Sequence, residues 1–403
     1  MKLCVRIILV SFLFFVLAEA GIMARTLPDT TGFAVVAEEQ RQGYKCFLIE
    51  YGGVSADPAV PVSGSVSAGR PAVASDIAAG EDLIRSYLLV PDGASALDKR
   101  PGLVLLHDHG ARFDIGKEKL VRPLAESPGH IRRSSEEFVR TNFDGVYFAD
   151  SLASLGYVVI VPDMLYWGSR STEACQEWSR LKYGDPGMSQ DEIGLYCGQM
   201  AADRKKTRLD SLKKAVYEGQ RTVYDSLAAT GVIWAEKTMA EDALAARILS
   251  GLDFVDPGNI AAFGWSMGAH RTWLLTAFCQ DIKTGAALCW MTLKEAGKTP
   301  YKASDYALLI PRLRDRYDFP DIALKLVPKP FLFLSGTRDH LFPVRAVEKA
   351  YDRMQSIYDE HGAEGRLRTE FFEGGHHCGK EVQCMIVEFF EKTVPLHDVP
   401  ETD

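Results

Sequence analysis

A serine between two glycines directly follows an apolar run in residues 259–270, N-I-A-A-F-G-W-S-M-G-A-H. The G-x-S-x-G pattern at 264–268 is typical of a strand that ends in a sharp turn before a helix, with the serine at the apex. A side chain two positions before or after that serine would collide with the adjoining strand or helix, which explains both glycines. We therefore predict that Ser266 is presented as a nucleophile.

Two further segments with reactive side chains follow Ser266. Asp339 lies in a loop beyond the apolar run 331–334, and His376 and His377 follow a double glycine after another short strand. Each candidate lies just past the end of a strand, at the edge of an open α/β sheet where ligands bind. We expect this edge to bring the three kinds of side chain together.

These residue types can form one catalytic unit. A serine hydroxyl needs a base to take its proton, an imidazole can accept and return that proton, and a carboxylate fixes the imidazole tautomer. We assign Ser266 as nucleophile, Asp339 as orienting acid and His376 as base. His376 is preferred because it directly follows the glycines, where the loop can fold back over the serine, and His377 is the alternative base.

Each residue also has a structural interpretation when taken alone. Ser266 could be a turn residue, Asp339 could be the N-cap of a helix that begins near Pro343, and residues 376–377 could be a loop or a surface metal scavenger. The order of the three residue types and their places at strand ends favour catalysis.

Stabilising a tetrahedral intermediate requires two N–H donors. Met267 supplies one, because the first amides of a helix have no intrahelical acceptor. The second is expected from the loop after the apolar run 103–106, where Ala111 is the predicted donor and Gly110 the alternative.

His107 and His109, in the same loop, are expected to hydrogen-bond the loop backbone and hold its shape. A metal role is disfavoured, because adjacent residues on a strand point to opposite faces. We predict neither a metal nor a cofactor.

Five motifs span residues 101 to about 380: H-D-H-G-A-R-F-D-I-G-K-E, V-V-I-V-P-D-M-L-Y-W-G-S-R, G-W-S-M-G-A, G-T-R-D-H-L-F-P and a final G-G-H-H. With them the chain resembles the α/β-hydrolase superfamily, in particular the secreted branch of the dienelactone-hydrolase and acetyl-xylan-esterase-like group. The resemblance implies a serine hydrolase with Ser266, Asp339 and His376 as its triad. Many relatives have a single histidine after the glycines, so His377 leaves the base assignment open.

The resemblance also implies a carboxylesterase that cleaves short acyl esters, with acetyl esters of plant polysaccharides as the leading substrate. A serine peptidase of the same fold is one alternative, although the first 80 residues are too short for an added propeller. A non-catalytic carbohydrate-binding relative is the other, although such proteins tend to lose a triad member and this chain has all three.

Composition and pattern agree with this fold. The 403 residues carry a net charge of −8 and are 47% hydrophobic, which supports one large α/β domain with additions, or two domains. The negative charge and the lack of a basic run with interleaved aromatics argue against a nucleic-acid partner. Strand-like runs alternate with helical segments, which predicts a mostly parallel sheet covered on both faces. The expected strands are 44–51, 83–90, 103–106, 157–162, 260–263, 286–291, 331–334 and one ending at 372, and the expected helices are 148–155, 233–250, 344–361 and 381–393.

Residues 1–20 are typical of an export signal. Lys2 and Arg6 are followed by the apolar run 7–18 and by a small-x-small cleavage pattern at 18–20. The apolar run is short for a membrane span, although a retained anchor is the alternative. We expect a secreted or periplasmic protein with no stable membrane association after cleavage.

The rest of the chain divides into an N-terminal extension at 21–80 and a catalytic domain at 81–403. A charged helical insertion at 171–232 is expected to cover the site as a lid, and a solvated helical face is the alternative. Tyr166 and Trp167, just before the insertion, are expected either to line the substrate cleft or to pack their loop.

Eight cysteines are present, and seven remain after removal of the signal segment, so at least one thiol stays unpaired. An exported protein can form disulfides. The candidate pairs are Cys175 with Cys197, inside the insertion, and Cys378 with Cys384, beside the candidate base.

Overall fold

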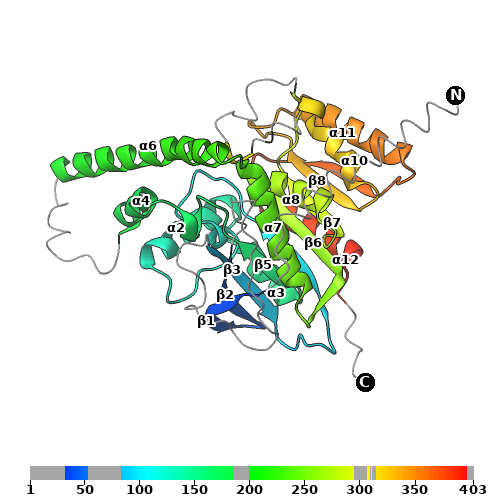
Figure 1. Cartoon of the computed structure of the whole chain (residues 1–403), viewed down its shortest axis with the longest axis horizontal. Coiled ribbons are helices and arrows are strands. Elements are labelled where there is room, and N and C mark those ends of the chain that lie inside the picture. The colour runs from blue at the N-terminus through cyan, green and yellow to red at the C-terminus, as the bar shows by residue number, and fades with distance from the viewer. Residues whose placement is uncertain are drawn as a thin grey trace.

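The computed structural model describes residues 32–52, 83–184, 199–294, 306–308, 310 and 315–396 of the chain. In that part of the chain nine strands form one sheet in the order β1-β2-β3-β5-β4-β6-β7-β8-β9 (Figure 1). The strands from β5 to β9 in this order pair in parallel, whereas β1, β2 and β3 extend the sheet by antiparallel pairing. The predicted mostly parallel α/β sheet is therefore confirmed. The strands are β1 Ala34–Arg41, β2 Tyr44–Gly52, β3 Leu83–Pro91, β4 Arg100–Leu106, β5 Val158–Pro162, β6 Val255–Trp265, β7 Thr284–Leu288, β8 Phe331–Gly336 and β9 Leu367–Phe372.

Helices cover both faces of the sheet, because alternate residues of the buried strands point to opposite sides. Leu103 and Leu105 of β4 join a core with α2, α3 and α12, whereas Val104 and Leu106 join a core with α7 and α8. Helix α11 packs with α8 over the later strands β7 and β8. The helices are α2 Gly129–Asn142, α3 Phe148–Leu155, α4 Glu173–Tyr183, α6 Gln199–Ala229, α7 Trp234–Ser250, α8 Met267–Phe278, α10 Ala323–Leu326, α11 Val344–Glu360 and α12 Lys380–Thr393, with short 3₁₀ turns such as η2 Lys117–Lys119.

Part of the predicted N-terminal extension belongs to the sheet. Strands β1 and β2 both fall within 21–80, and β2 pairs along its whole length with β3. Arg41 of β1 and Tyr44 of β2 bind the carboxylate of Asp150 on α3 at 2.8 and 2.5 Å. Residues 34–52 thus form one edge of the same sheet as the predicted domain at 81–403.

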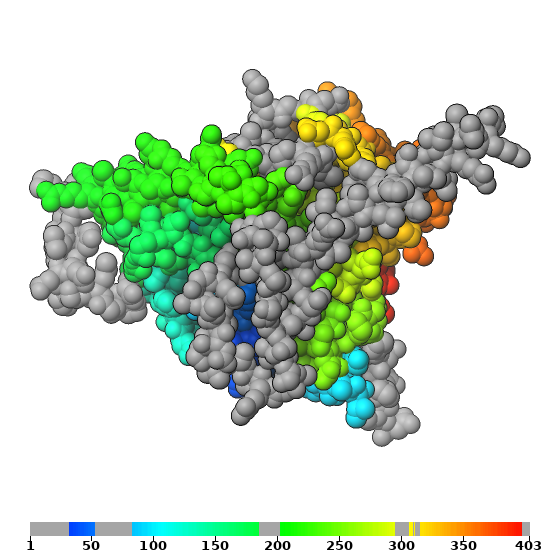
Figure 2. Space-filling view, viewed as in Figure 1, coloured from blue at the N-terminus to red at the C-terminus, as the bar shows by residue number. Residues whose placement is uncertain are grey.

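The insertion is helical where the structure describes it. Helix α4 packs against both α2 and α6, and α6 extends beyond the sheet as a long ridge (Figures 1 and 2). The middle of α6 contacts the loops at the sheet edge: Tyr166 Oη donates to the carbonyl oxygen of Val216 at 2.6 Å, and the rings of Phe113 and Tyr217 lie 5.4 Å apart. Part of the insertion therefore covers loops next to the candidate site.

The predicted disulfide between Cys378 and Cys384 is wrong. Both thiols are free, and Cys378 is buried before α12 whereas Cys384 is exposed on that helix. Cys175 is buried with a free thiol, and its candidate partner Cys197 lies outside the described residues.

The predicted signal segment at 1–20 also lies outside the described residues. Among the helices that are described, none combines the length and the apolar composition that a bilayer crossing requires.

Candidate active site

Ser266 occupies a strained turn between β6 and α8. Its backbone adopts φ 55° and ψ −120°, which a non-glycine residue seldom adopts, and its amide donates to the carbonyl oxygen of Leu288 at 2.8 Å. A Cβ on Gly264 would lie 2.1 Å from the carbonyl oxygen of Gly268, and a Cβ on Gly268 would lie 1.9 Å from that of Leu106. Both glycines are therefore required by the close approach that the sequence pattern predicts.

The substitution Gly268→Ala should destabilise the protein by at least about 3 kcal/mol, because the added methyl group meets rigid backbone rather than a movable side chain. The urea midpoint of unfolding measures this loss. The matched control is Gly32→Ala, because a Cβ there meets nothing within 4 Å. A G268A variant as stable as G32A would contradict the tight packing at this turn.

His376 and Asp339 form a buried pair at the same sheet edge. Nδ1 of His376 lies 2.7 Å from Oδ2 of Asp339, and the exposed fractions of the two side chains are 12% and 0%. Burial alone would raise the pKa of Asp339, but hydrogen bonds from His376, from the Leu341 amide at 2.8 Å and from Cys289 hold it below its ordinary value. The N-cap of α11 is Pro343, so the alternative in which Asp339 caps that helix does not hold.

The structure separates the two adjacent histidines. His377 Nε2 lies 3.3 Å from Oδ1 of Asp144, and both side chains are more than a third exposed. The ring of His376 instead packs 5.2 Å from that of Trp265, the residue before Ser266, and stacks at 5.9 Å on Phe342. His376 is thus the histidine that the fold places beside both the acid and the serine turn.

Cys289 was not predicted as part of this site. The strand expected at 286–291 ends at Leu288, because Cys289 has φ 55° and its amide turns to the carbonyl oxygen of Leu334 at 2.7 Å. Polar atoms of Cys289, Asp339 and His376 all lie within 4.8 Å of one another, the only such group of potential metal ligands in the described residues. Burial raises the pKa of the Cys289 thiol well above its ordinary value, so the thiol keeps its proton and donates to Asp339.

Substitutions at Cys289 should shift the acid limb of the kcat/KM profile, which reports the base of the free enzyme. Cys289→Ala removes a donor from Asp339, so the carboxylate holds the imidazolium more strongly and the limb moves to higher pH. Cys289→Ser supplies a stronger donor and moves the limb to lower pH. Shifts in the same direction for both variants would contradict this role.

The loop after β4 carries the candidate oxyanion donors. The Ala111 amide donates to Nδ1 of His109 at 3.1 Å, so it would have to leave this partner to bind a substrate oxygen. Lys119 Nζ donates to the carbonyl oxygens of Asp108 and His109 at 2.7 and 2.9 Å, and these two hydrogen bonds hold the loop in place. Among the described residues, none accepts a hydrogen bond from the amides of Met267 or His109.

The two loop histidines are structural, as expected. His107 Nε2 accepts from the Met164 amide at 3.2 Å, and its Nδ1 lies 3.0 Å from the carbonyl oxygen of Asp108. Burial lowers the pKa of His107 well below its ordinary value and that of His109 to about 3, so both rings stay neutral. Tyr166 and Trp167 are 2% and 0% exposed and pack the neighbouring loop.

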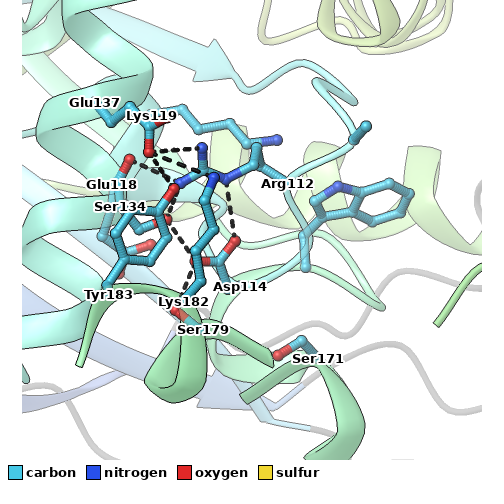
Figure 3. Close-up of polar contacts among 12 residues, drawn as sticks. Arg112, Asp114, Glu118, Lys119, Ser134, Glu137, Ser171, Ser179, Lys182 and Tyr183 are labelled. Atoms are coloured by element: carbon cyan, nitrogen blue, oxygen red, sulfur yellow. Dashed lines mark hydrogen bonds and ion pairs between the residues drawn. The ribbon is translucent and has the colours of Figure 1, made fainter. Parts of the chain in front are cut away.

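Arg112 joins the loop to the insertion. Figure 3 shows its guanidinium between two carboxylates. Arg112 Nε lies 3.5 Å from Oδ1 of Asp114 in the same loop, and Nη1 lies 3.6 Å from Oε2 of Glu137 on α2. The rings of Trp178 and Tyr183 on α4 lie 5.7 and 5.1 Å from it. The carboxylate of Asp114 is in turn bound by Ser134 of α2 and Ser179 of α4.

Comparisons with known proteins agree with the fold. No family model matches the sequence. Over 301 residues the chain is 23% identical to "Putative hydrolase YtaP" of Bacillus subtilis (strain 168), with 72% of this chain and 78% of that protein covered. A putative acetyl xylan esterase from Bacteroides fragilis superposes with a TM-score of 0.56 at 15% identity, covering 88% of this chain and 72% of that one. A glucuronoyl esterase from Solibacter usitatus superposes with a TM-score of 0.53 at 9% identity, covering 93% and 91%.

Identities this low show the fold alone. The sheet order and the strained serine turn, together with these superpositions, show that the chain has the α/β-hydrolase fold.

Proposed function

We propose that the chain is a serine carboxylesterase that cleaves short acyl esters. The observation that carries the proposal is the 2.7 Å hydrogen bond between His376 and Asp339, next to a serine turn whose backbone is strained. Strained backbone costs free energy and persists only where the surrounding structure enforces it, and such residues cluster at functional sites. The hydrolase and esterase names of the relatives support the same reaction class.

In the proposed reaction His376 takes the proton of Ser266 as the hydroxyl attacks the ester carbonyl. Asp339 stabilises the imidazolium that forms and holds the ring in place. His376 then protonates the leaving alcohol, and water activated by the same ring releases the acid from the acyl-enzyme.

The amide of Met267 holds the developing oxyanion from the start of α8, where the helix dipole also favours negative charge. Ala111 is the proposed second donor, and its amide has to exchange its hydrogen bond to His109 for one to the oxyanion. The amide of Gly110 is the alternative second donor, and no described residue accepts a hydrogen bond from it or from the amide of His109.

The proposed substrate is an acetyl or other short acyl ester, with acetylated plant polysaccharide as the leading choice, and the proposed location is outside the cytoplasm. The substrate rests on the acetyl xylan esterase neighbour and on the motifs shared with that group. The location rests on the signal-like residues 1–20. We propose no cofactor and no nucleic-acid partner.

A fluorophosphonate probe combined with a substrate panel tests this function. We expect the probe to label Ser266 and the enzyme to cleave p-nitrophenyl acetate and acetylated xylan faster than peptide anilides. Preferential cleavage of the anilides would instead indicate a peptidase. Lack of labelling at Ser266 would favour a non-catalytic carbohydrate-binding protein.

A further inference from the structure

Asp108 is a buried carboxyl group that the proposed reaction does not use. It is 2% exposed, and neither of its oxygens accepts a hydrogen bond from another described residue. The nearest ammonium, that of Lys119, lies 4.0 Å from Oδ1 and directs its hydrogen bonds to the carbonyl oxygens of Asp108 and His109. Buried polar groups are nearly always hydrogen-bonded, so an orphaned carboxyl requires an explanation.

The surroundings of Asp108 place it at the candidate site. A Cβ on Gly110 would lie 2.5 Å from its Oδ2, so the carboxyl lies directly against the loop of the oxyanion donors. His376 is among the groups that lower the pKa of Asp108, so the candidate base lies within electrostatic range of this carboxyl. The preceding residue, His107, has its carbonyl oxygen against the start of α8, where a Cβ on Gly268 would lie 3.0 Å away. Asp108 therefore lies against the loop of the candidate oxyanion donors, and the residue before it contacts the start of α8.

The chemistry of this position favours the neutral acid. Burial raises the pKa of Asp108, and attraction to Lys119, His376 and Arg112, together with its own backbone amide, offsets only part of that rise. A carboxylate without donors in such surroundings is costly, whereas a protonated carboxyl has an O–H to donate.

We propose that Asp108 keeps its proton in the resting enzyme and donates its O–H to the carbonyl oxygen of the bound ester as negative charge develops there. A carboxylic acid kept neutral by an apolar site can serve an oxyanion in this way. The proposal rests on the proposed ester hydrolysis and adds a side-chain donor to the Met267 amide. It also gives the site a donor that is not already engaged, unlike the amide of Ala111.

The test compares Asp108→Asn with Asp108→Ala on p-nitrophenyl acetate. Asparagine keeps the shape and an N–H donor but cannot ionise, so D108N should keep most of the wild-type kcat/KM. D108A removes the donor and should lower kcat by about 10²-fold with little change in KM, as loss of one oxyanion donor does. The rates are compared at a temperature at which melting curves show every variant folded.

Two patterns would overturn the proposal. If D108N loses as much kcat as D108A, the ionised form of Asp108 is the active one. If D108A matches the wild type, Asp108 does not contact the reacting ester. A parallel Ser266→Ala variant separates these outcomes from the proposed function, which fails only if S266A still hydrolyses the ester.

Discussion

The variant Ser266→Ala should fold normally and lose about 10⁵-fold or more in kcat on p-nitrophenyl acetate, because no other group can form the acyl-enzyme. The fold should survive because alanine keeps the Cβ that the turn already accommodates and removes only a hydroxyl. The lost activity is measured as initial rate, and the retained fold by circular dichroism and the melting midpoint.

The matched control is Ser356→Ala. Ser356 is exposed on α11 and its hydroxyl binds only its own helix, at the carbonyl oxygen of Asp352. S356A should hydrolyse the ester at the wild-type rate. Wild-type turnover by S266A would place the nucleophile elsewhere and remove the basis of the proposed function.

The variant His376→Ala should lose about 10⁴-fold to 10⁶-fold in kcat/KM, whereas His377→Ala should stay near the wild type. His376 binds a fully buried carboxylate, so its loss removes the proton carrier and leaves Asp339 without its main partner. The pair between His377 and Asp144 is exposed, and such pairs contribute at most about 1 kcal/mol to stability.

The pattern across the two histidine variants decides the identity of the base. Kinetics over pH 5 to 9 on both proteins, with active-site titration of Ser266, would show whether the loss is in turnover. A large loss in H377A with an active H376A would reverse the assignment and require the 376–377 loop to move during the reaction.

Much of this site could be predicted from the sequence because its parts lie where short patterns meet strand ends. The glycines around Ser266 are required because a Cβ on either would lie 2.1 or 1.9 Å from a backbone oxygen, and this requirement leaves a local signature in the sequence. Asp339 and His376 each follow an apolar run and a glycine. Because the carboxyl ends of parallel strands meet at one edge of the sheet, residues that follow different strands come together there even when they are far apart in the chain.

What could not be predicted depends on contacts between distant segments. In the sequence Cys289 simply continues an apolar run. In the structure its positive φ, beside Asp339, ends the strand at the preceding residue. Ala111 has the expected place in the loop, but its amide is taken by a side chain two residues earlier. Helix α2 has a charged sequence without a side-chain N-cap, and its helical form depends on packing against α4 and η2.

The environment of Arg112 ties the insertion to the loop after β4, which carries the proposed oxyanion donors. The guanidinium belongs to the loop of the oxyanion donors, yet its aromatic neighbours Trp178 and Tyr183 come from α4. Removing α4 to widen access for a bulky polymer would remove the aromatic rings that pack on this guanidinium. It would also remove the hydrogen bond from Ser179 to Asp114. Replacing the insertion with a foreign segment would therefore disturb the loop of the proposed oxyanion donors as well as access to the candidate site, unless the new segment also packed against Arg112.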